Sequence, residues 1–424
     1  MQLRKEIKEV VKKMYMWRIA KLGYKLASPL INELGTKTFI GGKLIDANKE
    51  TIIIVSHEAS ITGAPILALN ICKELGKRYN IVSVILRNGE LGEKFRTNSQ
   101  ICILPRFGIF SSGMLKESLS KINIVDKPKY AIVNSIVSAK SIQPLRQNGI
   151  PVMTLVHEFS AYIRPINLME MVGMWSNALV FSSELTRQDI LENSPVIRNC
   201  KTLVIPQGKC GSISNKGKNH LESEIFNEAE NYIRNLNNET IMILGAGQIQ
   251  PRKGVDLFIS VASHILKNNK EHKIEFIWIG DGYDPINDFN ISLWLKDQIK
   301  RSGLKDKMQI FGSTDNYSDF IKRANIFLVT SRLDPMPNVA IDAIYAKTPT
   351  YCFQDACGLA DLYRSETLLG GSLIADYCDT NHMANLVNKL IRDKERYNKI
   401  ADLCAEKAKI WFDMKSYANK IDKI

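Results

Sequence analysis

The chain has 424 residues, which is too long for one typical domain and sufficient for two. Its apolar content of 45% supports buried cores and excludes an intrinsically disordered protein. The formal net charge of +13 predicts an anionic partner, which is a phosphate compound, a membrane surface or a nucleic acid.

Residues 1–30 are predicted to form a basic amphipathic helix. Basic residues outnumber acids eight to two, and Ile7, Val10, Met14 and Trp17 recur at helical spacings. Such a helix can lie on anionic lipid, and we favour this interpretation. The alternative is a helix that packs on the first domain and exposes its lysines to water.

A buried strand is predicted at Thr51–Val55, and it leads into a loop that contains His57, Glu58 and Gly63. An apolar helix is expected from Ile66 to Leu75. Gly63 allows the backbone of this loop to approach a ligand closely, because glycine has no Cβ.

Further strands alternate with helical segments, which predicts a doubly wound parallel sheet. These strands are expected at 81–86, 130–134, 151–156, 178–182 and 203–206. The strand at 151–156 ends in His157-Glu158, as the first strand ends in His57-Glu58. Open α/β sheets bind ligands at the carboxyl ends of their strands, so we expect functional roles for both histidines. The alternative for each is a purely structural histidine.

A second domain is predicted after a linker and helix at 207–238, a region that begins Gly/Ser/Asn/Lys-rich without periodicity. Its first strand, at 241–245, leads to Arg252 and Lys253 just before a helix N-terminus. A flexible ammonium and a forked guanidinium suit a pyrophosphate. A dinucleotide fingerprint is disfavoured because the G-x-G is not followed by the third glycine, and a solvated Arg-Lys turn is the remaining alternative.

A strand–loop–helix unit is predicted at 326–347. The strand covers Ile326–Val329, a polar loop follows, and Pro337 suits the first turn of the helix. Such a unit directs backbone N–H groups and the positive end of the helix dipole towards an anion. Asp334 lies just before the helix and Asp342 about two turns into it. Other expected elements are strands at 275–280, 308–311 and 351–353, a helix at 315–324 and a helical tail from 383 to 424.

The segment 325–349 resembles the signature of the retaining, GT-B-fold glycosyltransferases often called family 4, or glycosyl transferases group 1. In that signature, S-x-x-E-G-x-P-x-V-x-x-E-A, seven residues separate two acids. The matching positions are Ser331, Asp334, Pro337, Val339, Asp342 and Ala343. Both acids are Asp rather than Glu and are one methylene shorter. The family's G-R-x-x-x-x-x-K-G turn matches at Lys253, but its Arg falls on Gly247, so Arg252 is expected to turn inward and supply that charge.

The resemblance implies a GT-B fold of the α/β class, with two Rossmann-like doubly wound domains facing a cleft and a final helix that crosses back to the first domain. The expected divisions are the N-terminal helix (1–30), an acceptor domain (31–206), a linker (207–238), a nucleotide-sugar domain (239–400) and a crossover helix (401–424).

The resemblance also implies roles for individual residues. His157 would contact the donor sugar, Asp334 would lie near the sugar ring as the second catalytic residue, and Asp342 would hold the ribose hydroxyls. The full donor-binding set is Gly63, Arg252, Lys253, Met336, Pro337, Asn338, Val339 and Asp342. His57 and Glu58 are candidates for the acceptor side.

The implied reaction is transfer of a sugar, with retention, from a UDP- or GDP-type nucleotide sugar to a glycan or lipid-linked acceptor in bacterial surface polysaccharide synthesis. No Asp-x-Asp motif stands in a suitable place, so neither a metal ion nor another cofactor is expected. The alternative on the same fold is a nucleotide-sugar epimerase or phosphorylase. A nucleic-acid-binding protein is disfavoured because no segment outside residues 1–30 interleaves aromatic and basic residues.

The expected location is the cytoplasm, with peripheral contact expected at the inner face of the membrane through residues 1–30. The eight cysteines make no C-x-x-C pair and no cluster with histidine, so they are interpreted as reduced thiols. No apolar run of about eighteen residues and no secretory signal is recognised.

Overall fold

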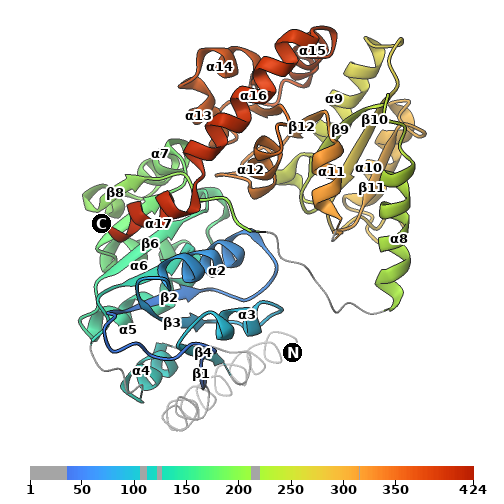
Figure 1. Ribbon diagram of the computed structural model, residues 1–424. Coiled ribbons are helices and arrows are strands. Elements are labelled where there is room, and N and C mark those ends of the chain that lie inside the picture. Colours follow the sequence, from blue (N-terminus) through green and yellow to red (C-terminus); the bar gives the residue numbers. More distant parts are fainter. Residues whose placement is uncertain (1–35, 106–111, 122–126, 212–219, 315) are drawn as a thin grey trace, which may run out of the picture. The chain divides into compact units, whose positions relative to one another are not determined.

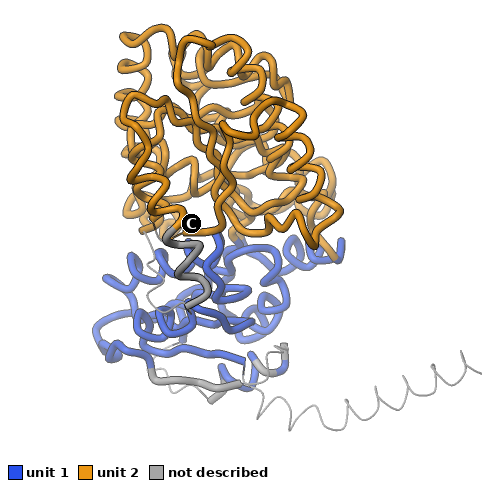
Figure 2. The backbone as a smooth tube through the Cα atoms, turned by 90° about the vertical axis from the view of Figure 1, so that its right-hand side faces the viewer, with its two compact units in different colours: residues 1–154, 165–177 blue, residues 155–164, 178–424 orange. Residues whose placement is uncertain are grey.

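A computed structural model describes residues 36–105, 112–121, 127–211, 220–314 and 316–424 (Figure 1). The expected basic helix at 1–30 lies outside these residues. The chain divides into two compact units, the first formed by residues up to Thr154 with Pro165–Asn177, and the second by Leu155–Arg164 with Ala178–Ile424 (Figure 2). The domain boundaries expected at 206 and 238 stay a prediction.

The first sheet is eight-stranded, with the order β1-β4-β3-β2-β5-β6-β7-β8. Its strands are β1 (Thr36–Ile40), β2 (Thr51–Ser56), β3 (Asn80–Ile85), β4 (Ile101–Pro105), β5 (Ala131–Asn134), β6 (Val152–Val156), β7 (Ala178–Phe181) and β8 (Lys201–Val204). β1 pairs antiparallel with β4, whereas β2 pairs in parallel with both β3 and β5. The strands β3, β4 and β1 therefore lie on one side of the central pair formed by β2 and β5, and β6, β7 and β8 lie on the other side.

Helices connect these strands, as the alternation in the sequence predicts. They are α2 (Gly63–Leu75), α3 (Gly92–Thr97), α4 (Ser112–Lys121), α5 (Ile142–Gln147), α6 (Asn167–Trp175) and α7 (Glu184–Asn193), with the short 3-10 helices η1 (Ile136–Ser141), η2 (Ser160–Tyr162) and η3 (Pro195–Asn199). The strand expected at 203–206 lies two residues earlier, as β8, and two strands of this sheet, β1 and β4, were not predicted.

The second sheet is six-stranded and its pairs are parallel, with the order β11-β10-β9-β12-β13-β14. Its strands are β9 (Ile241–Ala246), β10 (Ile274–Ile279), β11 (Met308–Phe311), β12 (Ile326–Val329), β13 (Thr350–Phe353) and β14 (Ile374–Ala375). The strand order reverses between β9 and β12. In open α/β sheets, ligands bind outside the carboxyl ends of the strands at such a reversal.

The helices of the second unit include α8 (His220–Asn235), η4 (Pro251–Lys253), α9 (Val255–Lys267), α10 (Ser292–Arg301), α11 (Tyr317–Arg323), α12 (Asn338–Tyr345), α13 (Leu359–Arg364), α14 (Thr367–Leu373), α15 (Thr380–Arg392), α16 (Lys394–Trp411) and α17 (Met414–Asp422). α9 and α15 pack side by side (Figure 1), and Asn269, just after α9, donates to Asn388 of α15 at 2.5 Å. The expectation of two doubly wound sheets is confirmed.

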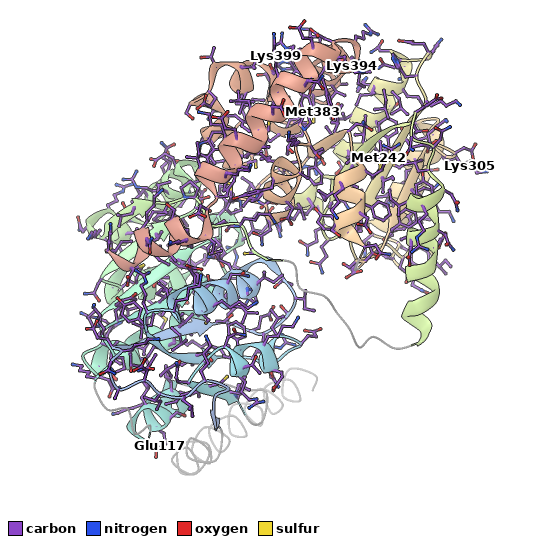
Figure 3. The ribbon with its side chains drawn as sticks, viewed as in Figure 1. Glu117, Met242, Lys305, Met383, Lys394 and Lys399 are labelled. Carbon is purple, nitrogen blue, oxygen red and sulfur yellow. The ribbon has the colours of Figure 1, made fainter. Side chains whose placement is uncertain are left out.

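The core of the second unit forms because the central strands are apolar on both faces. Met242 in β9 and Met383 in α15 are fully buried, whereas Lys305, Lys394 and Lys399 are exposed (Figure 3). The rings of Phe258 and Trp278 pack edge to face at 5.4 Å between their centroids. Burial of such apolar surface stabilises the fold by about 25 cal/mol per Å².

The C-terminal helix returns to the first sheet, as expected. Lys201 in β8 donates a hydrogen bond from Nζ to the backbone oxygen of Ile424, at 3.3 Å. The backbone N–H of Lys209 donates to the carbonyl oxygen of Phe412, at 2.7 Å. Among the helices of the described ranges, none combines the length and hydropathy needed to span a bilayer.

Candidate functional site

The turn after β9 and the loop after β12 meet at the carboxyl edge of the second sheet. Gly254 adopts a left-handed conformation, with φ +65°, and begins α9. A Cβ at this position would lie 2.0 Å from the carbonyl oxygen of Thr330, just after β12. The hydroxyl of Thr330 donates to the carbonyl oxygen of Gly254 at 2.8 Å. This close packing brings η4, which contains Arg252 and Lys253, against the loop that contains Asp334.

Lys253 and Asp334 form an ion pair in which Nζ of Lys253 donates to Oδ2 of Asp334. Both groups are largely buried, with 14% and 7% of their side chains exposed. Ser331 donates a second hydrogen bond to the same carboxylate oxygen, at 3.3 Å. The backbone N–H of Asp334 donates to the carbonyl oxygen of Ala356 at 2.7 Å, which fixes the loop to the segment after β13. Lys253, predicted to bind the donor, and Asp334, predicted to be catalytic, are therefore in contact.

Gly247 shows how the Lys253 side chain is accommodated. A Cβ at Gly247 would lie 3.2 Å from Cδ of Lys253, so the lysine stem passes close to this glycine. The φ of Gly247 is +148°, a backbone conformation that L side chains rarely adopt. The position where the family's Arg was expected therefore has a backbone that favours glycine.

Arg252 is half-buried, and its Nε donates to Oε1 of Gln250 at 3.2 Å. The expectation that Arg252 supplies the positive charge of the family's Arg, whose position is occupied by Gly247, stays a prediction. A further cation, Arg332, was not singled out from the sequence. Its guanidinium forms two hydrogen bonds with Asp256 in the first turn of α9, at 2.9 and 2.6 Å. The signal that could have identified Arg332 is its place two residues before Asp334, in the loop that follows β12.

The helix α12 begins one residue later than predicted, because Pro337 is its extended N-cap rather than its first residue. Gln207, which is buried, donates through Nε2 to the carbonyl oxygen of Met336 at 3.1 Å and to Oδ1 of Asn338 at 2.5 Å. The segment after β8 therefore holds the loop entering α12. Val339 follows Asn338 in the first turn of the helix, where the positive end of the dipole lies.

Asp342 lies on α12 and pairs with Lys209, whose Nζ donates to Oδ1 at 2.7 Å. Burial raises the pKa of Asp342, and the Lys209 ammonium opposes this shift. The carboxylate is thus kept available in a partly buried position by a nearby cation. Lys209 is a second residue that the sequence did not single out.

His157 follows β6, and its backbone N–H donates to Oε2 of Glu158 at 3.0 Å. The next turn is fixed by Asp189, which accepts from the backbone N–H and the hydroxyl of Ser160 at 2.6 and 3.0 Å. The contact of His157 with a donor sugar stays a prediction.

The remaining predicted residues belong to the first unit. The carboxylate of Glu58 accepts a hydrogen bond from the hydroxyl of Ser60 at 2.6 Å, and one of its oxygens is 3.7 Å from Nε2 of His57. Gly63 is exposed and is the first residue of α2, so this helix begins three residues earlier than the predicted Ile66. The acceptor-side roles of His57 and Glu58 stay predictions, as does the donor contact of Gly63.

Comparison with known proteins agrees with this architecture. Residues 227–406 match the family model described as glycosyl transferases group 1. The chain is 25% identical over 182 residues to mannosylfructose-phosphate synthase from Agrobacterium fabrum, a match that covers 42% of this chain and only 39% of that protein's length.

Solved structures share the fold over most of the chain. HepE from Anabaena, in complex with UDP and glucose, superposes with a TM-score of 0.67 at 14% identity, covering 88% of this chain and 98% of that one. Sucrose-phosphate synthase from Thermosynechococcus elongatus gives a TM-score of 0.66 at 15% identity, with the same coverage of 88% and 98%. These likenesses show that the fold is GT-B.

Proposed function

We propose that this protein, whose residues 227–406 have the sequence pattern of the glycosyl transferases group 1 family on a GT-B fold, transfers a sugar from a nucleotide-diphosphate sugar to an acceptor hydroxyl. The observation that carries the proposal is the meeting of Lys253 and Asp334 at the strand-order reversal between β9 and β12. A cation and a carboxylate are thereby held together at the edge of the sheet where ligands bind in this class of fold.

The proposed chemistry is electrostatic. When the sugar departs, the diphosphate gains negative charge, which preorganised cations and helix N-termini stabilise. The ammonium group of Lys253 has three N–H donors, one of which is engaged by Asp334, so two remain for phosphate oxygens. The first-turn amides of α12, at Asn338 and Val339, would face the same anion, with Arg252 as a second cation.

The remaining residues of the site also have proposed roles. Asp342 would hold the ribose, Met336 and Pro337 would line the donor site, and Asp334 and His157 would face the transferred sugar. Transfer would retain the anomeric configuration and would need no metal ion, because cationic side chains neutralise the leaving group. HepE in its complex with UDP-glucose supports a UDP-type donor.

The proposed acceptor is a glycan or lipid-linked molecule of bacterial surface polysaccharide synthesis, with the nucleotide-sugar donor as the other substrate. His57 and Glu58 would contribute to the acceptor side from the first unit, whereas Gly63 would contribute to the donor site. The net charge of +13 supports contact with an anionic membrane surface from the cytoplasmic side.

Thermal-shift measurements with UDP, GDP, ADP and CMP test the proposal. One nucleoside diphosphate should raise the melting temperature, since a ligand at about 100 times its Kd stabilises the native state by about 2.7 kcal/mol. Lys253→Ala should weaken its binding about 10- to 100-fold, because a hydrogen bond to a charged group contributes about 1.5–3 kcal/mol. Lys267→Ala, at the exposed far end of α9, is the matched control and should bind normally.

Mass spectrometry of products then separates transfer from the other reactions of this fold. A transferase forms a glycosylated acceptor only when an acceptor is supplied, and it should do so in the presence of EDTA. An epimerase would convert the donor without an acceptor, and a phosphorylase would require phosphate. If no nucleotide stabilises the protein, or if Lys253→Ala binds like the wild type, the proposed function is wrong.

A further inference from the structure

Arg332, in the loop after β12, binds the backbone of η4 through both its main chain and its side chain. Its backbone N–H donates to the carbonyl oxygen of Arg252 at 2.8 Å. Its guanidinium Nη1 donates to the carbonyl oxygen of Pro251 at 2.7 Å. Arg332 therefore holds the two residues that directly precede Lys253, and so fixes the backbone from which the Lys253 side chain extends.

The guanidinium of Arg332 is in turn held by Asp256, in the first turn of α9. Nη1 donates to Oδ1 at 2.9 Å and Nη2 donates to Oδ2 at 2.6 Å, a bidentate contact with a defined direction. Asp256 is itself anchored, because its carbonyl oxygen accepts hydrogen bonds from the hydroxyl of Ser260 at 3.0 Å and from Nε2 of Gln298 at 2.9 Å. Arg332 therefore connects η4 to the body of the helix that follows it.

The same loop also holds the other end of the Lys253 side chain. Asp334, two residues after Arg332, accepts a hydrogen bond from Nζ of Lys253. Because the backbone of η4 is held by Arg332 and Nζ is held by Asp334, the two N–H donors that remain on the ammonium have a defined direction. A cation that is oriented before the ligand binds stabilises developing charge without the cost of reorganisation.

The pair formed by Arg332 and Asp256 should contribute little to the stability of the fold. Its side chains are 34% and 41% exposed, whereas those of Lys253 and Asp334 are 14% and 7% exposed. Exposed ion pairs add little stability, because water competes for both charges. Loss of the exposed pair should therefore leave the protein folded and reveal what the pair does for the turn.

We infer that Arg332 is a positioning residue of the donor site, which together with Asp256 holds η4 so that the ammonium of Lys253 meets the terminal phosphate of a nucleoside diphosphate. Arg332 acts through the turn rather than on the phosphate, because its guanidinium is engaged by Asp256 and Pro251. The terminal phosphate is the group that gains charge when the sugar departs. This role rests on the proposed function, because it takes the ligand to be a nucleoside diphosphate.

Asp256→Asn is the most informative variant, because positioning and simple charge effects predict opposite results. If Arg332 positions η4, loss of the bidentate contact should loosen the turn and weaken UDP binding about 10-fold, the effect of losing one hydrogen bond to a charged group. If the pair acts only through its charges, removing a carboxylate near an anion site should strengthen UDP binding. Calorimetric titration measures the affinity for UDP, or for the nucleoside diphosphate that gives the largest thermal shift.

Titration with the corresponding monophosphate, UMP, shows whether the effect is confined to the terminal phosphate. Asp256→Asn should bind UMP with nearly wild-type affinity, whereas a general loss of structure would weaken UMP and UDP binding together. The matched control is Asp297→Asn in α10, because Asp297 is 42% exposed and accepts a hydrogen bond from Nε of Arg301 at 2.6 Å. This control should leave both affinities unchanged.

Variants of Arg332 test the geometry of the contact. Arg332→Lys keeps the positive charge but loses the fork, so one ammonium cannot hold Pro251 and both oxygens of Asp256. It should bind UDP more weakly than the wild type does. Combining Arg332→Met with Asp256→Asn should cost no more UDP affinity than Arg332→Met alone, because both changes remove the same contact. Urea denaturation checks that each variant is folded, and Arg332→Gln replaces Arg332→Met if that protein is not.

The results separate this role from the proposed function. If Asp256→Asn binds UDP as tightly as the wild type or more tightly, or if Arg332→Lys binds normally, Arg332 does not position the turn, and the proposed function stands as long as Lys253→Ala weakens binding. If Asp256→Asn loses UDP and UMP affinity together, the pair has only a structural role. If the wild type binds no nucleoside diphosphate, both proposals fail.

Discussion

The side chains of Lys253 and Asp334 are largely withdrawn from water, with 14% and 7% of their area exposed. Burying two charges has a desolvation cost that their attraction offsets only when both are present. Either partner alone would leave an unpaired charge among buried groups. The pair is therefore expected to matter for stability as well as for the proposed donor binding.

Removing one partner should destabilise the second unit strongly. Asp334→Ala leaves the Lys253 ammonium without its carboxylate, and we expect a loss of about 3–5 kcal/mol in the free energy of unfolding, measured by urea denaturation. The control is Glu50→Ala, which breaks the exposed pair with Lys129, whose side chains are 46% and 60% exposed. That change should cost less than about 1 kcal/mol. Equal losses in the two variants would show that the Lys253–Asp334 pair is effectively solvated.

At the scale of elements, the short connection between β9 and α9 sets the position of the donor site. η4 ends at Gly254, whose positive φ starts α9 and presses the turn against Thr330 after β12. The eight-residue helix α12 is too short to be stable alone and depends on its packing. Gln207 and Lys209 tie its first and second turns to the segment after β8.

Gly254→Ala tests whether this contact fixes the turn. The change combines a left-handed alanine with a Cβ placed 2.0 Å from a backbone oxygen, so the turn must move away from Thr330. Gly303→Ala is the matched control, because its φ of +73° is similar but nothing lies within 4 Å of its Cβ. We expect about 1 kcal/mol of destabilisation for Gly303→Ala and clearly more for Gly254→Ala in urea denaturation.

The donor affinity of Gly254→Ala should fall as well, because Lys253 precedes this residue directly. Titration of both glycine variants with the nucleoside diphosphate identified by thermal shift measures this effect. Gly303→Ala, at the end of α10, should bind like the wild type. If the two variants show the same stability and the same affinity, the close approach at Thr330 does not position the turn.

At the scale of the whole molecule, the net charge of +13 favours anionic ligands. Part of this charge belongs to the predicted basic helix at 1–30, which lies outside the described residues. The proposed substrate is itself an anion, so long-range attraction should contribute to its binding, and dissolved salt should screen it.

Raising the ionic strength should therefore weaken the binding of the nucleoside diphosphate. Between about 0.01 M and 0.15 M salt the screening length shortens from about 30 Å to about 8 Å, so the protein's distant charges no longer act on the ligand. Calorimetric titrations at several salt concentrations measure the effect. The uncharged nucleoside, titrated in parallel, should show almost no salt dependence, and an equal dependence for both ligands would contradict the electrostatic account.

Much of the fold was predictable because its strands carry a strong local signal. β11 and β12 lie at the predicted residues, β2 and β9 each extend one residue further, and β10 begins and ends one residue earlier than predicted. These strands are continuous apolar runs, which parallel sheets produce because both faces are covered. β1 begins with three polar residues and β14 has only two residues, so neither contains such a run and both were missed. β4 was also missed, although residues 101–104 are a continuous apolar run.

The sequence by itself determined the α/β class, the two doubly wound sheets and the segments that contain Lys253, Asp334 and Asp342, because periodicity and local motifs are properties of neighbouring residues. Only the tertiary structure decided which side chains meet. Lys253 pairs with Asp334, and Lys209 pairs with Asp342, over sequence separations of 81 and 133 residues. Such contacts depend on the strand order and on how each loop packs, and no local pattern encodes them.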